Sequence, residues 1–444
     1  MNLKSLQAKT EPTKPEITSM VQRVIAIILA TFLATGSALP ALALGTETTE
    51  RASTDAPHSI LTTLNTNPDP SLAPNGTSLN ILDTQTNELF KFPLQSINGG
   101  PISGQPMHSA IQANGKKIYI TMGGNQTLPT RIAVITLNWL NGKPLPSLSK
   151  TIELLPAGTL GNEANGASCH PGEPGIRQEG HGPQLTTDGQ YLLFSELQNN
   201  QVVAINTTTD TISSETPSSE TTFAPHGLYP NPSGTRAASP HYWFDENKVS
   251  IWNINQTNGE LSFEENIELK SKDFEGSYLH TARWLDDNQF ITNATQDPEQ
   301  GNHQSQRSVW LVDTQSKKVT PILNEEDLLE GASDTIIANN KLYVAEGNIA
   351  KFLSNQDAPG NLSIWSLSDP LSPTLIKRLS PGNGLPDHFS NAHSLAKTKD
   401  EDQIFLESFS SNYLIKIDTK SDEVTATFDS GDGLIATHGL YITD

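Results

Sequence analysis

The chain has 444 residues, of which 35% are hydrophobic, with 31 glycines and 29 prolines, a composition typical of a turn-rich β protein with a sizeable core. Its formal net charge of −21 leaves no basic stripe to neutralise phosphates, which excludes nucleic acid and anionic membrane surfaces as expected partners. A negative charge of this size favours solubility and attracts cations.

The first 43 residues are predicted to be a signal peptide. Basic residues precede the apolar run Val24 to Ala34, which is too short for a comfortable membrane span. Ala41-Leu42-Ala43 then offers a small-x-small cleavage site. We expect cleavage near Ala43, a periplasmic or secreted protein and no stable membrane insertion after cleavage. An uncleaved anchor is the alternative.

Residues 44–77 are rich in Thr, Ser, Pro and Asn and are predicted to be a flexible leader. From Ser78 onward, short strand-like runs alternate with turn signals, and amphipathic helical periodicity is almost absent. The acidic stretch from Asn324 to Gly331 is the best helix candidate. The domain at 78–444 is therefore predicted to be all-β.

One pattern recurs along this domain: a histidine opens a run that ends in a turn and leads into a hydrophobic strand. The six histidines are His108, His181, His226, His280, His393 and His438. In a seventh run Ser333 takes that place, with Asp334 beside it. The seven starts are 73, 45, 54, 53, 60 and 45 residues apart. A period near 50 with several strands per unit predicts a β-propeller, and seven starts predict seven blades.

The last repeat indicates how the ring closes. His438 lies six residues before the C-terminus, so the remaining residues are too few to complete a blade. The strand-like run from Ser78 is the natural complement. We therefore expect a seven-bladed β-propeller closed by pairing of N- and C-terminal strands, which removes free sheet edges.

The one long interval between repeats contains an insertion at about residues 155–180. It has little strand character and carries Cys169, His170 and Glu179. Long segments of this kind inside compact folds are often functional. Cys169 is the only cysteine, so it forms no internal disulfide and is either a free thiol or a ligand.

Two stretches carry a resemblance to a known family. HGPQLTTDGQYLLFSELQNNQVVAINTTTDTI from His181 and KVSIWNINQTNGELSFEENIEL from Lys248 resemble repeats of the YVTN and lactonase-type seven-bladed propellers. The similarity covers nearly all of the chain after residue 78. It implies the fold but not one activity, because such propellers include lactonases, dehydrogenase subunits, metal-binding proteins and scaffolds. The repeated histidines also resemble those in the propellers of nitrous-oxide reductase and of the selenium-binding/methanethiol oxidase family. No motif of this chain aligns with either family.

In a propeller the start of each innermost strand faces its equivalents across the axis, so the repeated histidines are expected to converge. Neutral imidazoles suit zinc or copper and suit calcium poorly. The sequence predicts a metal site formed by His108, His181, His226, His280, His393 and His438, with Asp334 as a ligand or as a partner that orients an imidazole. Possible gating groups or extra ligands are Cys169, His170, Glu179 and His388.

Other interpretations stay open on the sequence alone. The histidines can form a structural ring that ties blade to blade. A lactonase-like hydrolase would use the channel histidines with Asp334 and Arg283 to open a sugar-type lactone. Arg283 lies three residues after His280, so strand alternation places it on the opposite face, which argues against this use. A non-enzymatic scaffold for a protein or carbohydrate is the third possibility. No dinucleotide fingerprint, Walker loop or nucleophile elbow occurs, so no nucleotide cofactor is expected.

Overall fold

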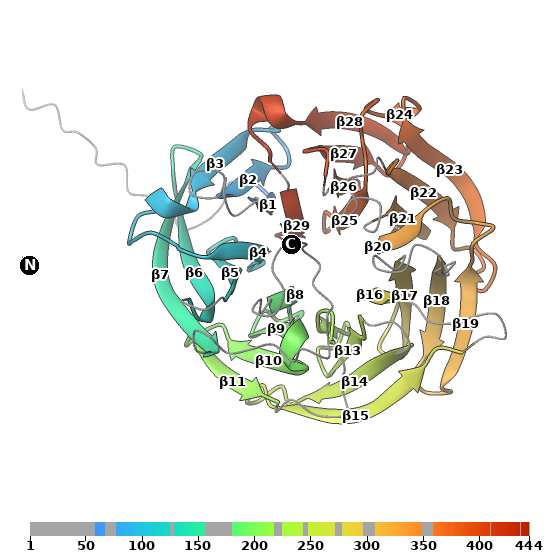
Figure 1. Ribbon diagram of the computed structural model, residues 1–444, viewed down its shortest axis with the longest axis horizontal. Helices are drawn as coiled ribbons and strands as arrows, with labels where there is room; N and C mark the ends of the chain where they lie inside the picture. The colour runs from blue at the N-terminus through green and yellow to red at the C-terminus, as the bar shows by residue number, and fades with distance from the viewer. Residues whose placement is uncertain are drawn as a thin grey trace, which may run out of the picture. The chain divides into compact units, whose positions relative to one another are not determined.

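Seven antiparallel sheets stand around a central axis in the computed structural model (Figure 1). In six of them the strand that comes first in the chain lies innermost, and in the seventh the last strand of the chain takes that place. The structure describes residues 58–66, 77–124, 128–155, 180–216, 224–242, 247–270, 278–295, 307–348, 358–408, 410–435 and 437–443. All of them belong to one compact unit, Arg51–Asp444. The predicted signal peptide lies outside the described residues. The predicted all-β, seven-bladed β-propeller is confirmed.

The blades are arranged in chain order. The first has β4 (Gln105–Ile111), β5 (Lys117–Gly123), β6 (Thr130–Leu140) and β7 (Lys143–Leu155). The second has β8 (Gly180–Leu185), β9 (Tyr191–Glu196), β10 (Gln201–Asn206) and β11 (Thr211–Glu215). The third has β12 (Tyr229–Pro230), β13 (Arg236–Pro240), β14 (Lys248–Ile254) and β15 (Leu261–Glu268).

The fourth blade has β16 (Tyr278–Trp284), β17 (Gln289–Thr295), β18 (Ser308–Asp313) and β19 (Lys318–Leu323). The fifth has β20 (Gly331–Ala338), β21 (Lys341–Gly347), β22 (Asn361–Ser366), β23 (Thr374–Pro381) and the short parallel strand β24 (Gly384–Leu385). The sixth has β25 (Ala392–Lys397), β26 (Gln403–Ser408), β27 (Leu414–Asp418) and β28 (Glu423–Phe428).

The seventh blade joins both ends of the chain, as predicted. Its order is β29 (Thr437–Ile442), β1 (Ile60–Asn65), β2 (Ser78–Asp83) and β3 (Leu89–Pro93). β1 pairs with β29 through Leu61–Ile442 and Leu64–His438. The predicted leader boundary is wrong here, because β1 falls within residues 44–77 and every one of its residues is buried. Its Thr-rich sequence is a good strand former, since threonine is β-branched.

The predicted helix from Asn324 to Gly331 does not form. Its first residues make a turn in which the Asn324 amide donates to the Asp327 carboxylate at 3.0 Å, and β20 begins at Gly331. The described helices are three 3₁₀ turns of three residues, η1 (Leu94–Ser96), η3 (Leu197–Asn199) and η4 (Ser430–Asp432). None of the described helices is long and apolar enough to cross a membrane.

The core lies between the blades. Inner strands such as β9 are buried along their whole length, because alternate side chains pack against the blade on either side. Seven hydrophobic clusters of described residues each bridge two adjacent blades. Outer strands alternate instead, as in β28, where one face is exposed. Burial between blades therefore holds the ring in shape.

Two polar clamps of the same design also join neighbouring blades. On β5, Lys117 and Tyr119 bind the Asp210 carboxylate of the next blade at 2.8 and 2.9 Å. On β21, Lys341 and Tyr343 bind Asp422 of the next blade at 2.7 and 2.8 Å. Each carboxylate sits in the turn before the outermost strand, so the clamp fixes one blade's second strand to its neighbour's edge.

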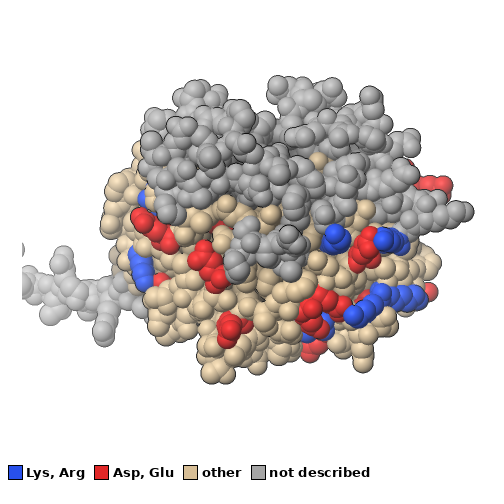
Figure 2. All heavy atoms as spheres, turned by 60° about the horizontal axis from the view of Figure 1, so that its bottom comes forward, with Lys and Arg blue, Asp and Glu red and all other residues tan. Residues whose placement is uncertain are grey.

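The described surface carries mixed charges. In Figure 2 lysine and arginine side chains stand beside aspartate and glutamate. One such exposed pair is Lys317–Glu265, with a 2.5 Å separation between Nζ and the carboxylate oxygen. Exposed pairs of this kind contribute about 0–1 kcal/mol each. The packed blade interfaces therefore account for far more of the stability than the surface ion pairs.

Candidate functional site at the propeller axis

Six imidazoles from six blades meet at the axis. His226 precedes β12, and the others lie on the innermost strands β4, β8, β16, β25 and β29. Neighbouring ring centroids are 4.1 to 5.3 Å apart. The circuit closes on itself through the pairs His108–His181, His181–His226, His226–His280, His280–His393, His393–His438 and His438–His108. We call these six residues the histidine ring.

The fifth blade contributes no imidazole. Ser333 is fully buried on β20 at the equivalent place. His280 and His393 approach each other in front of it, with ring centroids 5.3 Å apart. The ring therefore has six members in a seven-bladed fold.

The histidine ring is buried, and burial favours the neutral form of three of its members. Its members are 1 to 6% exposed. Loss of hydration on burial holds the pKa of His108, His226 and His280 well below the ordinary 6.5, and the neighbouring imidazoles lower it further because a second positive charge would be repelled. A neutral imidazole is the form that binds metal ions.

Backbone contacts fix the tautomer of two members. His226 Nδ1 donates to the His280 carbonyl oxygen at 2.8 Å, and His438 Nδ1 donates to the Met107 carbonyl oxygen at 2.9 Å. In a neutral imidazole the other nitrogen, Nε2, then carries a lone pair. Metal-binding histidines are commonly oriented in this way.

His108 and His181 have two ring nitrogens close together, and the ring nitrogens of His280 lack hydrogen-bond partners among the described residues. His108 Nε2 is 3.3 Å from His181 Nδ1. Neither nitrogen of His280 makes a hydrogen bond of normal geometry within the described residues, although the adjacent Ser333 main chain acts to raise its pKa. Buried polar atoms without partners are uncommon in folded proteins. A ligand in the channel would satisfy them.

The ring is not a preassembled metal centre. Within the described part of the chain, no group of three or more His, Cys, Asp or Glu side chains is already arranged to hold an ion. The imidazole centroids are instead 4.1 to 5.3 Å apart, with four neighbouring pairs tilted by 32 to 49° and two pairs edge to face at 62° and 86°. Binding a metal would require some of these side chains to rotate inward.

The innermost strands share a β-bulge at the histidine position. His181 pairs with Ser195 and Gln184 with Leu193, so three steps on β8 match two on β9. The same extra residue occurs on β4, β16, β20, β25 and β29. An inserted residue interrupts the alternation of a strand and re-aims the side chains beyond it. On β8, β16, β25 and β29 the third residue after the histidine therefore faces the channel again.

This bulge overturns the expectation for Arg283. The register shift lies between Leu279 and Ala282, so His280 and Arg283 point into the same cavity. The prediction that Arg283 lies on the opposite face of the strand was wrong, because it assumed that side chains alternate without interruption, and the extra residue of the bulge breaks this alternation. Arg283 therefore shares the site of the histidines instead of lying on the opposite face of the strand.

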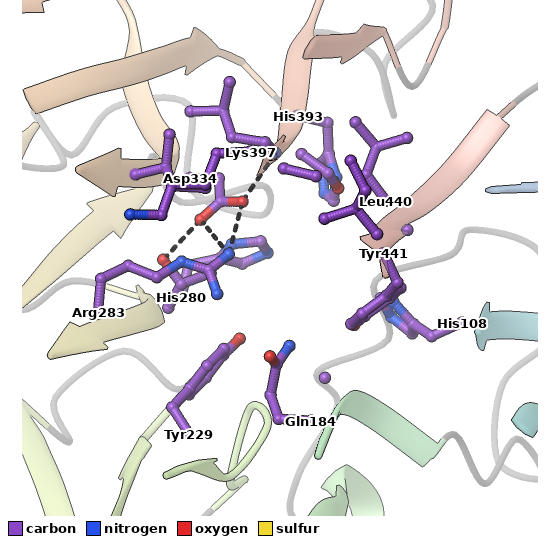
Figure 3. Close-up of a pocket in the computed structure, with 18 of the residues that line it drawn as sticks. His108, Gln184, Tyr229, His280, Arg283, Asp334, His393, Lys397, Leu440 and Tyr441 are labelled. Carbon is purple, nitrogen blue, oxygen red and sulfur yellow. Dashed lines mark hydrogen bonds and ion pairs between the residues drawn. The ribbon is translucent and has the colours of Figure 1, made fainter. Parts of the chain in front are cut away.

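A cavity of about 270 Å³ lies against the histidine ring, lined by His108, His226, His280 and His393 (Figure 3). Sequence reasoning missed several of its polar lining residues: Gln184, Tyr229, Lys397 and Tyr441. Three of them stand three residues after a ring histidine. The available signal was a glycine after the histidine, which takes a positive φ at Gly182, Gly227 and Gly439, as some bulges require.

Asp334 faces this cavity and is bound by Arg283. Arg283 Nη2 lies 3.0 Å from both Asp334 oxygens, and the Leu395 amide donates to the same carboxylate at 2.9 Å. Thr281 also donates to Asp334, at 3.0 Å. Asp334 makes no hydrogen bond to an imidazole in the described residues. Its carboxylate thus joins three blades rather than orienting a ring histidine.

A buried carboxyl supports the bulge after His438. Glu407 accepts hydrogen bonds from the Gly439 amide at 2.7 Å and from Thr63 at 3.1 Å. Burial raises the pKa of Glu407 to about 7, against the hydrogen bonds that lower it. This residue was not expected from the sequence, since nothing local marks a strand glutamate as buried.

Four candidate residues remain. Cys169, His170 and Glu179 fall in the segment between β7 and β8, outside the described residues. His388 is exposed in the turn before β25 and does not line the cavity.

Comparison with known proteins shows the fold alone. No protein family and no curated protein matches the sequence. Solved propellers match over most of the chain: the periplasmic gluconolactonase of Pseudomonas aeruginosa has a TM-score of 0.58 at 11% identity, covering 87% of this chain and 99% of that one. A hypothetical selenium-binding protein from Sulfolobus tokodaii has a TM-score of 0.56 at 11% identity, covering 88% and 94%. A protein of unknown function from Desulfotomaculum acetoxidans has a TM-score of 0.56 at 13% identity, covering 87% and 99%. The expected likeness to lactonase-type propellers is thus present in the architecture.

Proposed function

We propose that the histidine ring binds a transition-metal ion, zinc or copper, at the propeller axis. The observation that carries the proposal is the closed circuit of six buried imidazoles. Burial keeps His108, His226 and His280 neutral, so no proton has to leave before a metal binds to them. Soft and borderline ions prefer such nitrogen ligands.

The geometry favours a starting pair. Two nitrogens that each lie about 2.05 Å from a tetrahedral zinc ion are about 3.3 Å apart. His108 Nε2 and His181 Nδ1 already lie 3.3 Å apart, in a hydrogen bond whose proton would have to move to the other nitrogen of its ring before both could bind an ion. His438 is the nearest further imidazole to His108, with ring centroids 4.3 Å apart, and its Nε2 carries a lone pair. We expect these three residues to bind first, with small rotations of their side chains.

The ion would either be handled as cargo or supply Lewis-acid or redox chemistry beside the cavity. The predicted signal peptide would place this activity outside the cytoplasm. Asp334 is left out of the ligand set because Arg283 occupies both of its oxygens.

Metal titration tests the proposal. Chelator-treated protein is titrated separately with Zn²⁺, Cu²⁺ and Ca²⁺ by isothermal calorimetry, with elemental analysis of the loaded protein afterwards. We expect stoichiometric binding of zinc or copper and none of calcium. His181→Gln should weaken the metal affinity at least tenfold, whereas the control His388→Gln should leave it unchanged.

A folded wild-type protein that takes up neither zinc nor copper contradicts the proposal. Unchanged metal affinity in folded His181→Gln contradicts it as well. Unfolding of the metal-free His181→Gln and His393→Ala variants, without metal binding by the wild type, would indicate a purely structural ring.

The second candidate is hydrolysis of a sugar-type lactone in the same cavity. The observation that favours it is the shared location of Arg283 and the ring histidines. A guanidinium can polarise a lactone carbonyl while a neutral imidazole accepts a proton from water. Turnover of a sugar lactone by chelator-treated protein, lost in Arg283→Lys, would support this candidate. No turnover with or without metal would leave binding as the function.

A further inference from the structure

A second layer of polar side chains lies beside the histidine ring. Gln184, Tyr229, Arg283 and Tyr441 each stand three residues after a ring histidine, in four different blades. They line the cavity of about 270 Å³ together (Figure 3). A neighbouring recess of about 310 Å³ shares Gln184, Tyr229 and Arg283 as lining residues. The same position in four blades, three residues after a ring histidine, thus forms a polar chamber.

The guanidinium of Arg283 is held in place by some of its N–H groups, while others remain available as hydrogen-bond donors. Its Nη2 binds both oxygens of Asp334 at 3.0 Å, and its Nε donates to the Thr335 carbonyl oxygen at 2.9 Å. It also lies 5.4 Å from the centroid of the Tyr229 ring. Its Nη1 has no hydrogen-bond partner among the described residues. In Figure 3 the guanidinium faces the space between Tyr229 and Gln184.

The remaining members of the layer also have no hydrogen-bond partner for their polar groups among the described residues. The Tyr229 hydroxyl, the Tyr441 hydroxyl and the Gln184 amide make no hydrogen bond within the described residues. Tyr229 as a whole residue is 5% exposed. Polar groups that converge in a partly enclosed space without partners are typical of a ligand site.

Charge selects the class of ligand. Arg283 and Lys397 are the cationic side chains that line the cavity, and both are paired, Arg283 with Asp334 and Lys397 with Glu401, so these charges cancel. The Nη1 group of Arg283 still offers a charge-assisted hydrogen bond to one carboxylate. No unpaired cation in the described lining is left to balance the second charge of a dianion. The surrounding protein, at −21, would repel any further negative charge.

We propose that this layer binds a small monocarboxylate that carries hydroxyl groups. The carboxylate accepts hydrogen bonds from Arg283 Nη1, and its hydroxyl groups exchange hydrogen bonds with Tyr229, Tyr441 and Gln184. Guanidinium–carboxylate contacts are charge-assisted and therefore stronger than neutral ones. The proposal depends on the cavity and not on a metal in the histidine ring.

Binding of D-glycerate to chelator-treated protein tests the proposal and keeps it separate from metal binding. The comparison ligands are glycerol, which lacks the charge, and inorganic phosphate, which carries close to two charges at pH 8. By isothermal calorimetry we expect D-glycerate to bind, glycerol not to bind, and phosphate to bind at least tenfold more weakly.

Paired substitutions keep the buried charges balanced. Arg283→Met with Asp334→Asn should weaken D-glycerate binding at least tenfold. The control is Arg378→Met with Glu346→Gln, a similarly buried ion pair of 3.2 Å that does not line the cavity. It should bind D-glycerate like the wild type. Tyr229→Phe, which retains the ring, should weaken binding about threefold and serves if the first double variant does not fold.

Three results would overturn the proposal: equal binding of glycerol and D-glycerate, no binding of D-glycerate to folded wild-type protein, or unchanged binding in the folded Arg283/Asp334 variant. A wild-type protein that binds zinc but not D-glycerate contradicts this inference alone. One that binds D-glycerate but no metal contradicts the function proposed for the ring alone.

Discussion

His280 and His393 have ring centroids 5.3 Å apart with their planes at 86°, although a whole blade separates them in the chain. They meet because Ser333, at the equivalent position of that blade, is small and fully buried. A Cβ on Gly347 would lie 2.9 Å from Ser333 Oγ, so the space behind the ring is already filled. The closed circuit of six imidazoles in a seven-bladed fold thus depends on the small side chain of Ser333.

A seventh imidazole should not fit. Ser333→His places a large polar ring in a closed site, and we expect the free energy of unfolding to fall by about 1–3 kcal/mol. Ser333→Ala is the control, because Ser333 Oγ has no hydrogen-bond partner in the described residues, and it should change stability by less than about 0.5 kcal/mol. Urea unfolding measures both. A Ser333→His protein as stable as the wild type would show that the ring can expand.

Acidification should destabilise the metal-free protein. The pKa values of His108, His226 and His280 are depressed from 6.5 in the folded state, so below pH 6.5 the unfolded chain binds protons that the folded chain does not. Each of these histidines removes about 1.4 kcal/mol of stability per pH unit below 6.5 until its folded pKa is reached. Urea unfolding between pH 7.5 and 5.5 should show this loss. His388→Gln, at an exposed position, should give the same curve as the wild type.

Glu407 should have the opposite effect on how stability changes with pH. Its pKa is raised from 4.5 to about 7, so between these values the folded chain binds a proton that the unfolded chain lacks. Its contribution to stability is therefore lost as the pH rises through about 7 and recovered on acidification. Glu407→Gln removes this opposing effect and should make the loss of stability from pH 7.5 to 5.5 steeper by about 1.4 kcal/mol per pH unit. An unchanged slope would mean that Glu407 is ionised throughout.

The glycine that follows His226 should be intolerant of a side chain. Gly227 has φ +82°, and a Cβ there would lie 2.8 to 2.9 Å from the Tyr229 ring. We expect Gly227→Ala to lower the free energy of unfolding by about 2–4 kcal/mol, from backbone strain and displacement of Tyr229. Gly189→Ala is matched in φ at +68° but meets nothing within 4 Å, and should lose only about 1–2 kcal/mol. Equal losses in thermal unfolding would exclude the contact with Tyr229 as a cause.

The two polar clamps should contribute independently to the free energy of unfolding. Tyr119→Phe and Tyr343→Phe each remove one hydrogen bond to a buried or half-buried carboxylate, at 2.9 and 2.8 Å, and should each lower stability by about 1–2 kcal/mol. They lie in different blade interfaces, so the double variant should equal the two single losses combined within about 0.5 kcal/mol. A larger combined loss would indicate that the blades unfold as one coupled unit.

The sequence was sufficient to predict the number of blades, their order and the closure, because the repeated histidine marks each innermost strand. The strand Ile60–Asn65 escaped prediction because the residues around it have the composition of a linker, and its partner β29 lies at the other end of the chain. The position of Arg283 was predicted wrongly because a bulge leaves only a weak trace in the sequence. Glycine comes directly after the histidine in three of the repeats, but serine, threonine or aspartate takes that place in the others.

The pairing of β1 with β29 also sets an order of assembly during translation. Every ring member except His438 is synthesised before β29, so a nascent chain that stops short of residue 437 holds five imidazoles and a blade without its innermost strand. Truncated polypeptides would therefore lack both the closed sheet and the complete circuit of histidines.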